Sequence, residues 1–525
     1  MSDISQSFHD EMPYLSRPFP HSQPQNLRAI GLLFGLNPPA LATAKVLELG
    51  CSSGANIVSF AANYPNSQCV GIDISKVEID QGLNELSTFT CSNVTLKQAN
   101  ILEVDASWGE FDYIICHGVW SWVPKEVRDK IFEISKQNLS PNGIAHISFN
   151  TKPGWNMAST LRDMMLFHTQ NTSNPKEKVQ QSRAFLEFID EALEGDTSAY
   201  TQFLKKETDG LRAKTDSYLY GEYLCENNYS EYFKNFIAHA TDRNLSYLAD
   251  TDLAMMFLGN MPKKVVEQLG QVKNGILSEQ YMDFIRNTRF RRTLLCHDDL
   301  QIKKNVNAQS LEALLFTLSL IPEKDSKEIN FLNNTQVATF YYEGNKDVTI
   351  TSGKPIRKAM FYTLFEHTRY PLSIVDMVDK VASRLGVEKK AEIKQVLESE
   401  LLKLIFSGHV KIYCEAPKHI NEVTDNPTIT EYARNQLKYV SETHPWVTNQ
   451  LHEVVFTDQL MVHLLPILDG SRNKDALLDE MFELPNLNIN QGDQVVTDPE
   501  RRKVLLSQLL DVTLNKLKMS ALLVA

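Results

Sequence analysis

Cysteine is scarce in this chain of 525 residues, and none of its seven cysteines belongs to a Cys-x-x-Cys pair. This excludes zinc ribbons and disulfide scaffolds, which need closely spaced cysteines. An odd number of cysteines, several of them in predicted strands, is typical of a reduced, cytoplasmic protein. We therefore expect neither disulfide bonds nor a bound metal ion.

Basic residues are also in deficit, because 53 lysines and arginines stand against 65 aspartates and glutamates, giving a formal net charge of −12. Nucleic-acid affinity depends on basic side chains that neutralise phosphates, so we expect no nucleic-acid partner. The apolar runs at 464–468 and 521–525 are far shorter than the ~20 residues of a membrane-spanning helix. The first thirty residues lack a basic start followed by an apolar stretch. We expect neither a secretory signal nor stable membrane insertion.

Short β-branched runs alternate with amphipathic stretches between residues 45 and 150, as a parallel sheet with crossover helices requires. The predicted strands cover 45–49, 68–72, 94–98, 111–117 and 143–149. The pattern predicts an α/β fold with a doubly wound, Rossmann-like sheet, to which 244–248 and 290–296 add two closing strands. The second crossover helix should begin at Ser75, with Glu78 completing a capping box.

The length predicts several domains, since a single core stops growing at ~250 to 300 residues. Changes in the pattern of predicted strands and helices divide the chain into five regions. They are an N-terminal arm at 1–28, the Rossmann-like core at 29–150, a helical insertion or regulatory region at 151–240, closing strands at 241–300 and a mainly helical C-terminal region at 301–525. Within the last region, three helices and a short strand make the part around 355–415 winged-helix-like.

A glycine-rich turn follows the first predicted strand. That strand ends at Glu48, and Gly50 and Gly54 precede the next helix. The turn therefore lies at the carboxyl edge of the sheet, in the crevice where doubly wound sheets bind ligands. Asp73 ends the second strand, where its carboxylate can accept both hydroxyls of a ribose; in the alternative interpretation it only caps the following helix.

The neighbours of this turn decide between two cofactors. Ser52 stands where the dinucleotide motif Gly-x-Gly-x-x-Gly has the central glycine that lets a pyrophosphate approach. The carboxylate of Glu48 instead suits the ammonium of an amino-acid cofactor. Asn100 and the backbone of Ile101, after the third strand, can meet an adenine edge. The turn favours S-adenosylmethionine, and Cys51 within it is interpreted as a small packing residue.

Over residues 46–150 the chain resembles class I S-adenosylmethionine-dependent methyltransferases. The whole chain resembles a bacterial group with a methyltransferase regulatory domain, which includes the rickettsial protein lysine methyltransferases acting on outer-membrane protein B. The resemblance rests on YLSRPFP at 14–20, HGVWSWVP at 117–124, SFNTKPGW at 148–155, YLYGEYL at 218–224 and HLLPILDGSR at 463–472.

The resemblance implies which residues hold the cofactor. Glu48 and Gly50 would touch its methionine portion, Asp73 its ribose and Asn100 its adenine, although Asp is commoner than Asn at that last position. A carbonyl at 117 or 118 would bind the ammonium. The full predicted set is Glu48, Gly50, Cys51, Ser52, Gly54, Asp73, Ile74, Asn100, Ile101, His117 and Gly118.

The segment after the fourth strand bears on the methyl acceptor. Methyltransferases of nucleic-acid bases often carry Asn/Asp-Pro-Pro-Tyr/Phe here, whereas this chain has His-Gly-Val-Trp at 117–120. Trp120 and Trp122 suit a cationic substrate arm, since a ring face attracts an ammonium by ~0.5 to 2 kcal/mol; alternatively, Trp122 packs on the next helix. The candidate catalytic residues are Tyr14, His117, Trp120, Asn150, Tyr220 and Glu222, with Phe149, Tyr218 and Tyr223 beside them.

Three functions remain open from the sequence. The first is methylation of protein lysines, with a protein as the partner. The second is methylation of a small molecule. The third is a scaffold that binds S-adenosylmethionine without catalysis, suggested by the large region after residue 300. His117 is interpreted first as a packed residue at a strand end and second as a base. The sequence does not define the oligomeric state.

Overall fold

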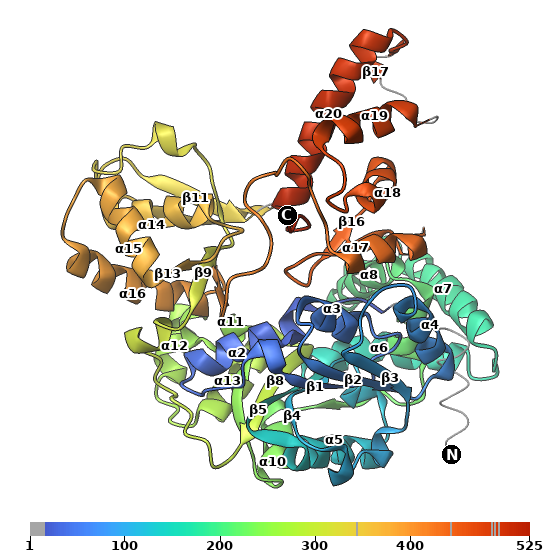
Figure 1. Cartoon of the computed structure of the whole chain (residues 1–525). Coiled ribbons are helices and arrows are strands. Elements are labelled where there is room, and N and C mark those ends of the chain that lie inside the picture. The colour runs from blue at the N-terminus through green and yellow to red at the C-terminus, as the bar shows by residue number, and fades with distance from the viewer. Residues whose placement is uncertain (1–15, 343–344, 442–443, 485–486, 488–489, 492–493) are drawn as a thin grey trace.

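The computed structural model describes residues 16–342, 345–441, 444–484, 487, 490–491 and 494–525. Its main sheet has the strand order β3-β2-β1-β4-β5-β8-β7, with β6 paired to β5 (Figure 1). The strands are β1 (Lys45–Leu49), β2 (Gln68–Asp73), β3 (Val94–Gln98), β4 (Phe111–Cys116), β5 (Leu139–Thr151), β6 (Ser230–Glu231), β7 (Leu245–Asp250) and β8 (Phe290–His297). β1 to β5 are parallel, whereas β8 runs antiparallel to β5 and β7. The predicted α/β, Rossmann-like class is confirmed.

Helices cover both faces of this sheet (Figure 1). One face packs against α2 (Pro24–Leu33), α3 (Ala55–Asn63) and α4 (Lys76–Leu86), and the other packs against α5 (Lys125–Gln137) and α10 (Phe233–Thr241). Side chains of a strand alternate between faces, so Val46 joins the first core and Leu47 the second. α4 begins where predicted, with the Ser75 hydroxyl accepting a hydrogen bond from the Glu78 N–H at 3.3 Å.

A helical insertion follows β5. It consists of α6 (Gly154–His168), α7 (Pro175–Ala192), α8 (Ala199–Arg212), the short α9 (Asp216–Leu219) and a π-helical turn (Tyr220–Leu224), around a hydrophobic core of its own. The helical pattern at 230–241 does not form a helix over its whole length. Ser230 pairs with Asn150 in the sheet, and α10 begins only at Phe233. Periodicity alone cannot reveal this long-range pairing.

The closing part of the main sheet contains three more helices. They are α11 (Leu253–Met256), α12 (Lys263–Leu269) and α13 (Gly275–Arg286), all between β7 and β8. α13 packs on α10, and its side chains reach the buried Arg291 of β8. The hydrogen bonds of Arg291 to Glu279 and Asp283 therefore lie between α13 and β8.

The region after residue 300 forms two units. In the first, α14 (Pro355–Glu366), α15 (Ile374–Leu385) and α16 (Lys390–Phe406) pack on the sheet β13-β9-β14, of β13 (Leu372–Ser373), β9 (Leu315–Leu318) and β14 (Val410–Tyr413), and on β10 (Ile321–Pro322), β11 (Ala338–Tyr342) and β12 (Asn345–Ser352). Its core is continuous with the sheet face under α2 and α3. The winged-helix-like interpretation of 355–415 remains a prediction.

The second unit has a separate core. Its elements are α17 (Glu431–Gln436), β15 (Trp446–Thr448), β16 (Val454–Phe456), α18 (Gln459–Leu464), α19 (Lys474–Glu483), β17 (Asn490–Gln491), β18 (Gln494–Val495) and α20 (Pro499–Met519). α20 projects away from the rest of the molecule in Figure 1.

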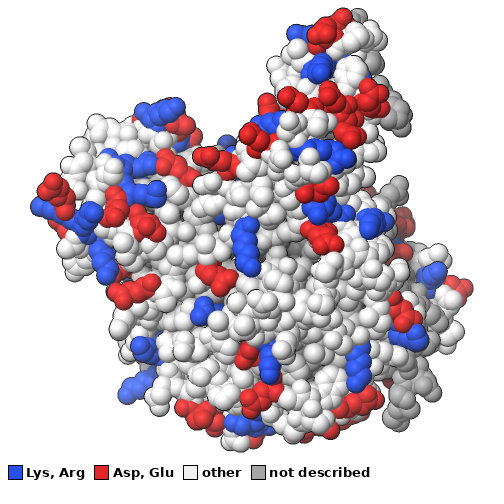
Figure 2. All heavy atoms as spheres, in the orientation of Figure 1, with Lys and Arg blue, Asp and Glu red and all other residues white. Residues whose placement is uncertain are grey.

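Charges of both signs are mixed over the face of the molecule shown in Figure 2, without a broad basic area on that face. In the part of the chain that the structure describes, no helix combines the length and the apolar character needed to cross a membrane. The expectation that nucleic acids are not partners stays a prediction.

Candidate functional site

The turn between β1 and α3 has a backbone that requires glycine. Gly50 and Gly54 have φ values of 75° and 88°, in the left-handed region that side chains disfavour. A Cβ atom on Gly50 would lie 2.3 Å from Cγ2 of Val119, which follows β4. Gly50 also donates its N–H to the carbonyl of Ile72 at 2.8 Å. The turn is thus held against the ends of β2 and β4.

Asp73 joins this turn from the end of β2. Its Oδ2 accepts the N–H of Ser52 at 2.8 Å, and its Oδ1 accepts the N–H of Ser75 at 3.0 Å. The second bond fits the capping interpretation of Asp73, while the first brings the carboxylate to the glycine-rich turn. Both roles are compatible, because a carboxylate has about four acceptor positions.

The predicted adenine contacts lie next to Asp73. Asp73 is paired with Gln98 of β3, and its carbonyl accepts the N–H of Ala99 at 2.9 Å. Asn100 follows, and its side-chain oxygen accepts the N–H of Leu102 at 3.0 Å, which starts a short turn at Ile101. The structure therefore gathers the turn after β1 and the ends of β2 and β3 at one edge of the sheet.

Glu48 is buried beneath the turn with one oxygen unused. Its Oε1 accepts a hydrogen bond from Nδ2 of Asn56 at 2.7 Å, whereas Oε2 is buried without a partner. Burial raises the pKa of Glu48 to about 8. A buried, unpaired carboxylate oxygen is costly, and the ammonium of an amino-acid cofactor would satisfy it. The residues present therefore fit S-adenosylmethionine.

A residue far along the sequence completes this arrangement. His452, in the loop between β15 and β16, is fully buried, and its Nε2 lies 2.8 Å from Oδ1 of Asn56 while its Nδ1 lies 2.9 Å from the Ser59 hydroxyl. Because Asn56 Oδ1 also accepts the N–H of Phe19 at 2.9 Å, it is an acceptor, and His452 donates through Nε2. Burial lowers the pKa of His452 to about 3, so the ring is neutral.

The hydrogen bonds that link His452 through Asn56 to Glu48 lead to a kinetic prediction. Replacing His452 with alanine leaves the Asn56 oxygen short of a donor, so we expect the KM for S-adenosylmethionine to rise about ten-fold, the equivalent of one buried hydrogen bond. We expect kcat to change less, and His452→Gln to recover much of the loss. Steady-state kinetics would measure this, with the exposed His463→Ala as the control. An unchanged KM in His452→Ala would contradict the coupling.

The candidate catalytic residues fall into separate places. Tyr14 lies outside the described residues. His117 follows β4 and packs on Phe19, with ring centroids 4.3 Å apart; its Nδ1 has no partner, and burial lowers its pKa to about 3. Gly118 donates its N–H to the Ser148 hydroxyl at 2.8 Å, which fixes the backbone where a cofactor carbonyl contact was predicted. A neutral His117 matches the packed interpretation.

The aromatic residue Trp120 belongs to the core. It is 1 % exposed and meets the rings of Phe149 and Phe236 edge to face, at 5.6 and 5.2 Å between centroids. It has no free surface to offer an acceptor, so burial corrects the expectation that Trp120 lines an acceptor pocket. Trp122 is only half-buried. Asn150 is buried with its Nδ2 unpartnered.

The cluster at 218–224 belongs to the helical insertion. Tyr220 and Tyr223 are buried in its core, and Tyr223 packs on Trp155 at 5.7 Å between ring centroids. Burial raises the pKa of Glu222 to about 8. Tyr220 and Tyr223 are therefore structural members of this core.

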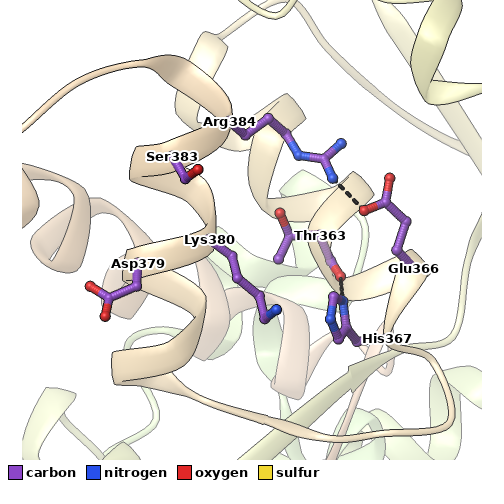
Figure 3. A pocket seen from close by; sticks show the side chains of 7 residues that line it. All are labelled: Thr363, Glu366, His367, Asp379, Lys380, Ser383 and Arg384. Carbon is purple, nitrogen blue, oxygen red and sulfur yellow. Dashed lines mark hydrogen bonds and ion pairs between the residues drawn. The ribbon is translucent and has the colours of Figure 1, made fainter. Parts of the chain in front are cut away.

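A hollow of about 550 Å³ lies between α14 and α15, and Figure 3 shows the side chains that line it. Its lining is polar and includes an ion pair of Glu366 with Arg384, and His367, whose Nδ1 lies 2.8 Å from the Thr363 carbonyl. None of the residues predicted to hold the cofactor or the acceptor lines it. We therefore assign it no part in methyl transfer.

Comparison with known proteins gives a consistent picture. Residues 46–143 match the family model of a methyltransferase domain, 215–297 that of a predicted methyltransferase regulatory domain, and 425–522 that of the PKMT C-terminal winged helix domain. The regulatory match spans the end of the region assigned to 151–240 and the closing strands. The winged-helix match lies in the last unit of the chain, beyond 355–415.

Relatives match over nearly the whole chain. Uncharacterized protein RP789 of Rickettsia prowazekii is 40% identical over 520 residues, which cover 98% of this chain and 93% of the relative. PKMT2 from Rickettsia typhi, solved in complex with AdoHcy, is 38% identical with a TM-score of 0.90, covering 98% of this chain and 100% of that one. The chain therefore belongs to the PKMT family of class I S-adenosylmethionine-dependent methyltransferases, and S-adenosylmethionine is its cofactor.

Proposed function

We propose that this enzyme methylates lysine side chains of a protein substrate of the outer-membrane type. The observation that carries the proposal is the match to PKMT2 over the full length, including the winged helix domain of that family at 425–522. A small-molecule methyltransferase would need no such additional units. Seven free cysteines support a site of action in the cytoplasm.

We propose that the residues predicted from the sequence bind the cofactor, each in its predicted role. Asp73 holds the ribose hydroxyls, the turn at 50–54 gives the methionine portion close contact with the backbone, and Glu48 receives the ammonium. Asn100 and Ile101 face the adenine. The support is their placement at one edge of the sheet, together with the unpaired oxygen of Glu48.

The cofactor supplies a methyl group on a sulfonium, whose departure as a neutral thioether needs no acid. What the chain must do is align the acceptor and exclude water. A lysine amine, with a pKa of ~10.4, must also lose its proton before it attacks. The buried surroundings of Glu222 and Asn150 are suited to favour the neutral amine, because desolvation lowers the pKa of an ammonium. We propose both as acceptor-site residues.

Methyl transfer from labelled S-adenosylmethionine to a purified outer-membrane protein fragment tests the proposal. We expect methyl-lysine in the fragment by mass spectrometry with the native chain, and none with Asp73→Ala. Turnover of small amines or hydroxyl compounds without any labelled protein would instead favour a small-molecule methyltransferase. Tight cofactor binding with no labelled acceptor in a lysate would indicate a scaffold.

Glu48 makes a further prediction about protons. With a pKa of about 8, it is mostly neutral in the free protein at pH 7. An ammonium beside it would lower that pKa, so we expect cofactor binding at pH 7 to release close to one proton. Affinity should then increase with pH up to about 8 and level off above it. Calorimetry of AdoHcy binding in buffers of different ionisation enthalpy would measure the release.

Glu48→Gln is the matched control for this measurement, since it keeps the hydrogen bond to Asn56 but has no proton to lose. If the native protein and Glu48→Gln release equal numbers of protons, Glu48 is not the group that receives the ammonium.

A further inference from the structure

Three histidines from distant parts of the chain meet on the sheet face that packs under α2 and α3. His21 comes from the short 3-10 turn Pro20–Ser22, His117 follows β4, and His146 is in the middle of β5. One ring nitrogen of each lies within 4.8 Å of the other two. His146 is completely buried, and the ring centroids of His21 and His117 are 4.7 Å apart.

The hydrogen-bonding state of these rings is unusual. Four of their nitrogens are buried without a partner, namely Nε2 of His21, Nδ1 of His117 and both nitrogens of His146. Buried polar atoms in folded proteins nearly always have partners. Several unpartnered ring nitrogens in one place therefore indicate a bound group that satisfies them together.

The chemistry of the three rings restricts that group. Burial lowers the pKa of all three, so the imidazoles are neutral. A neutral imidazole offers one lone pair, which is the form that binds metals.

We propose that His21, His117 and His146 bind one divalent transition-metal ion, with zinc as the best fit. Imidazole ligands suit zinc, copper, iron and nickel, and three protein ligands with an open fourth position are a common zinc arrangement. A point equidistant from three atoms 4.8 Å apart lies about 2.8 Å from each, so each ring moves by only about 0.7 Å to reach the Zn–N distance of ~2.1 Å.

A cavity lies beside one member of the cluster. A hollow of about 270 Å³ lies between the arm, the loop after β7 and the first C-terminal unit, and it is lined by His21, Asp252 and Tyr413 among others. His21 is the one histidine of the three that lines it. The ion would tie the arm to the sheet beside Phe19, whose N–H bonds to Asn56 of the cofactor site.

Two features moderate the expected affinity. The Arg292 guanidinium contributes to lowering the pKa of all three histidines, so the face carries positive charge. None of the described carboxylates hydrogen-bonds to these rings, and losing such an orienting partner typically weakens metal binding 10- to 100-fold. The sequence does not predict this site, because the three histidines lie far apart in the chain and form no closely spaced ligand motif.

Cobalt(II) is the probe for this site. The full chain, stripped with a chelator and free of cofactor, is titrated with Co²⁺, and we expect visible ligand-field bands that saturate at one equivalent and disappear when Zn²⁺ is added. His146→Phe, which fills the same space without a ligand atom, should lose the bands. His21→Gln, in the short turn at 20–22, repeats the test without a change in a strand of the sheet.

The exposed His463→Gln is the matched control and should keep the bands unchanged. Circular dichroism establishes that each variant is folded. Bands that persist in a folded His21→Gln, or their absence from the native chain, would overturn the proposal. Metal content after purification, measured per chain, gives an independent count: one ion in the native chain and in His463→Gln, and none in His21→Gln.

Discussion

Asp73→Ala should abolish measurable binding of S-adenosylmethionine while leaving the enzyme folded. In the proposed site, removing the carboxylate removes two charge-assisted hydrogen bonds to the ribose, each worth about 1.5 to 3 kcal/mol, so affinity should fall by about 100-fold or more. The same change also frees the N–H of Ser52, which loosens the turn after β1. Isothermal calorimetry with AdoHcy would measure the loss, and the unfolding temperature would report on the fold.

Asp105→Ala is a matched control for this change. Asp105 also accepts a backbone N–H two residues on, that of Ser107 at 2.9 Å, but it lies in an exposed turn outside the proposed site. It should therefore leave the affinity unaltered. Equal losses in the two variants would mean that a local turn, and not a ribose contact, explains the effect of Asp73→Ala.

Gly50→Arg tests the same site by a different physical route. The positive φ and the 2.3 Å approach of a Cβ atom to Val119 exclude any side chain from this position, so the turn must shift. We expect loss of cofactor binding in this variant as well. If both Gly50→Arg and Asp73→Ala bind AdoHcy with native affinity, the assignment of the cofactor to this edge of the sheet is wrong.

Local pattern was enough to predict that the proposed cofactor residues meet at one edge of the sheet. Glu48, Gly50 and Asp73 each lie at the end of a strand that the sequence pattern predicts. The carboxyl ends of parallel strands meet at one edge of the sheet. Their convergence therefore follows from the alternation of strands and helices alone. Burial was harder to foresee, because Trp120 reads as a surface aromatic in its loop but is enclosed by rings from α10 and β5.

The residues that the sequence missed are those joined by long-range contacts. His452 reaches Asn56 across nearly the whole chain, and neither residue lies in a recognisable motif. His21 and His146 have no spacing signal, because they meet only when the arm folds over the sheet. Ser230 has helical neighbours but joins the end of β5 instead. Such pairings are decided by tertiary packing, which a single sequence does not encode in local periodicity.

The largest effect on stability is expected at Arg291, within the region that matches the regulatory domain. Its side chain is fully buried on β8 and binds Asp283 of α13 through two hydrogen bonds, at 2.8 and 3.1 Å, and Glu279 at 2.8 Å. Asp250 of β7 lies 3.7 Å away. A single guanidinium thus interacts with three buried carboxylates between the sheet and α13.

Arg291→Met keeps the volume but removes the charge, and we expect it to lower the free energy of unfolding by about 3 to 5 kcal/mol, since the carboxylates become buried and unpaired. Arg292→Met is the neighbouring control. Its guanidinium is partly exposed and lies 3.8 Å from Asp252, so its loss should cost about 1 kcal/mol or less. Urea unfolding of both variants and the native chain would measure the difference.

The pH dependence gives this prediction a second, independent check. Burial raises the pKa of Glu279 to about 6 and raises that of Asp250, even though Arg291 lowers both. Without Arg291 these pKa values should rise further. A carboxyl group whose pKa is raised in the folded state destabilises the fold as pH increases above its ordinary value of about 4, so Arg291→Met should cost more at pH 8 than at pH 5. A cost that is equal at both pH values would show that lost packing, and not unpaired charge, causes the destabilisation.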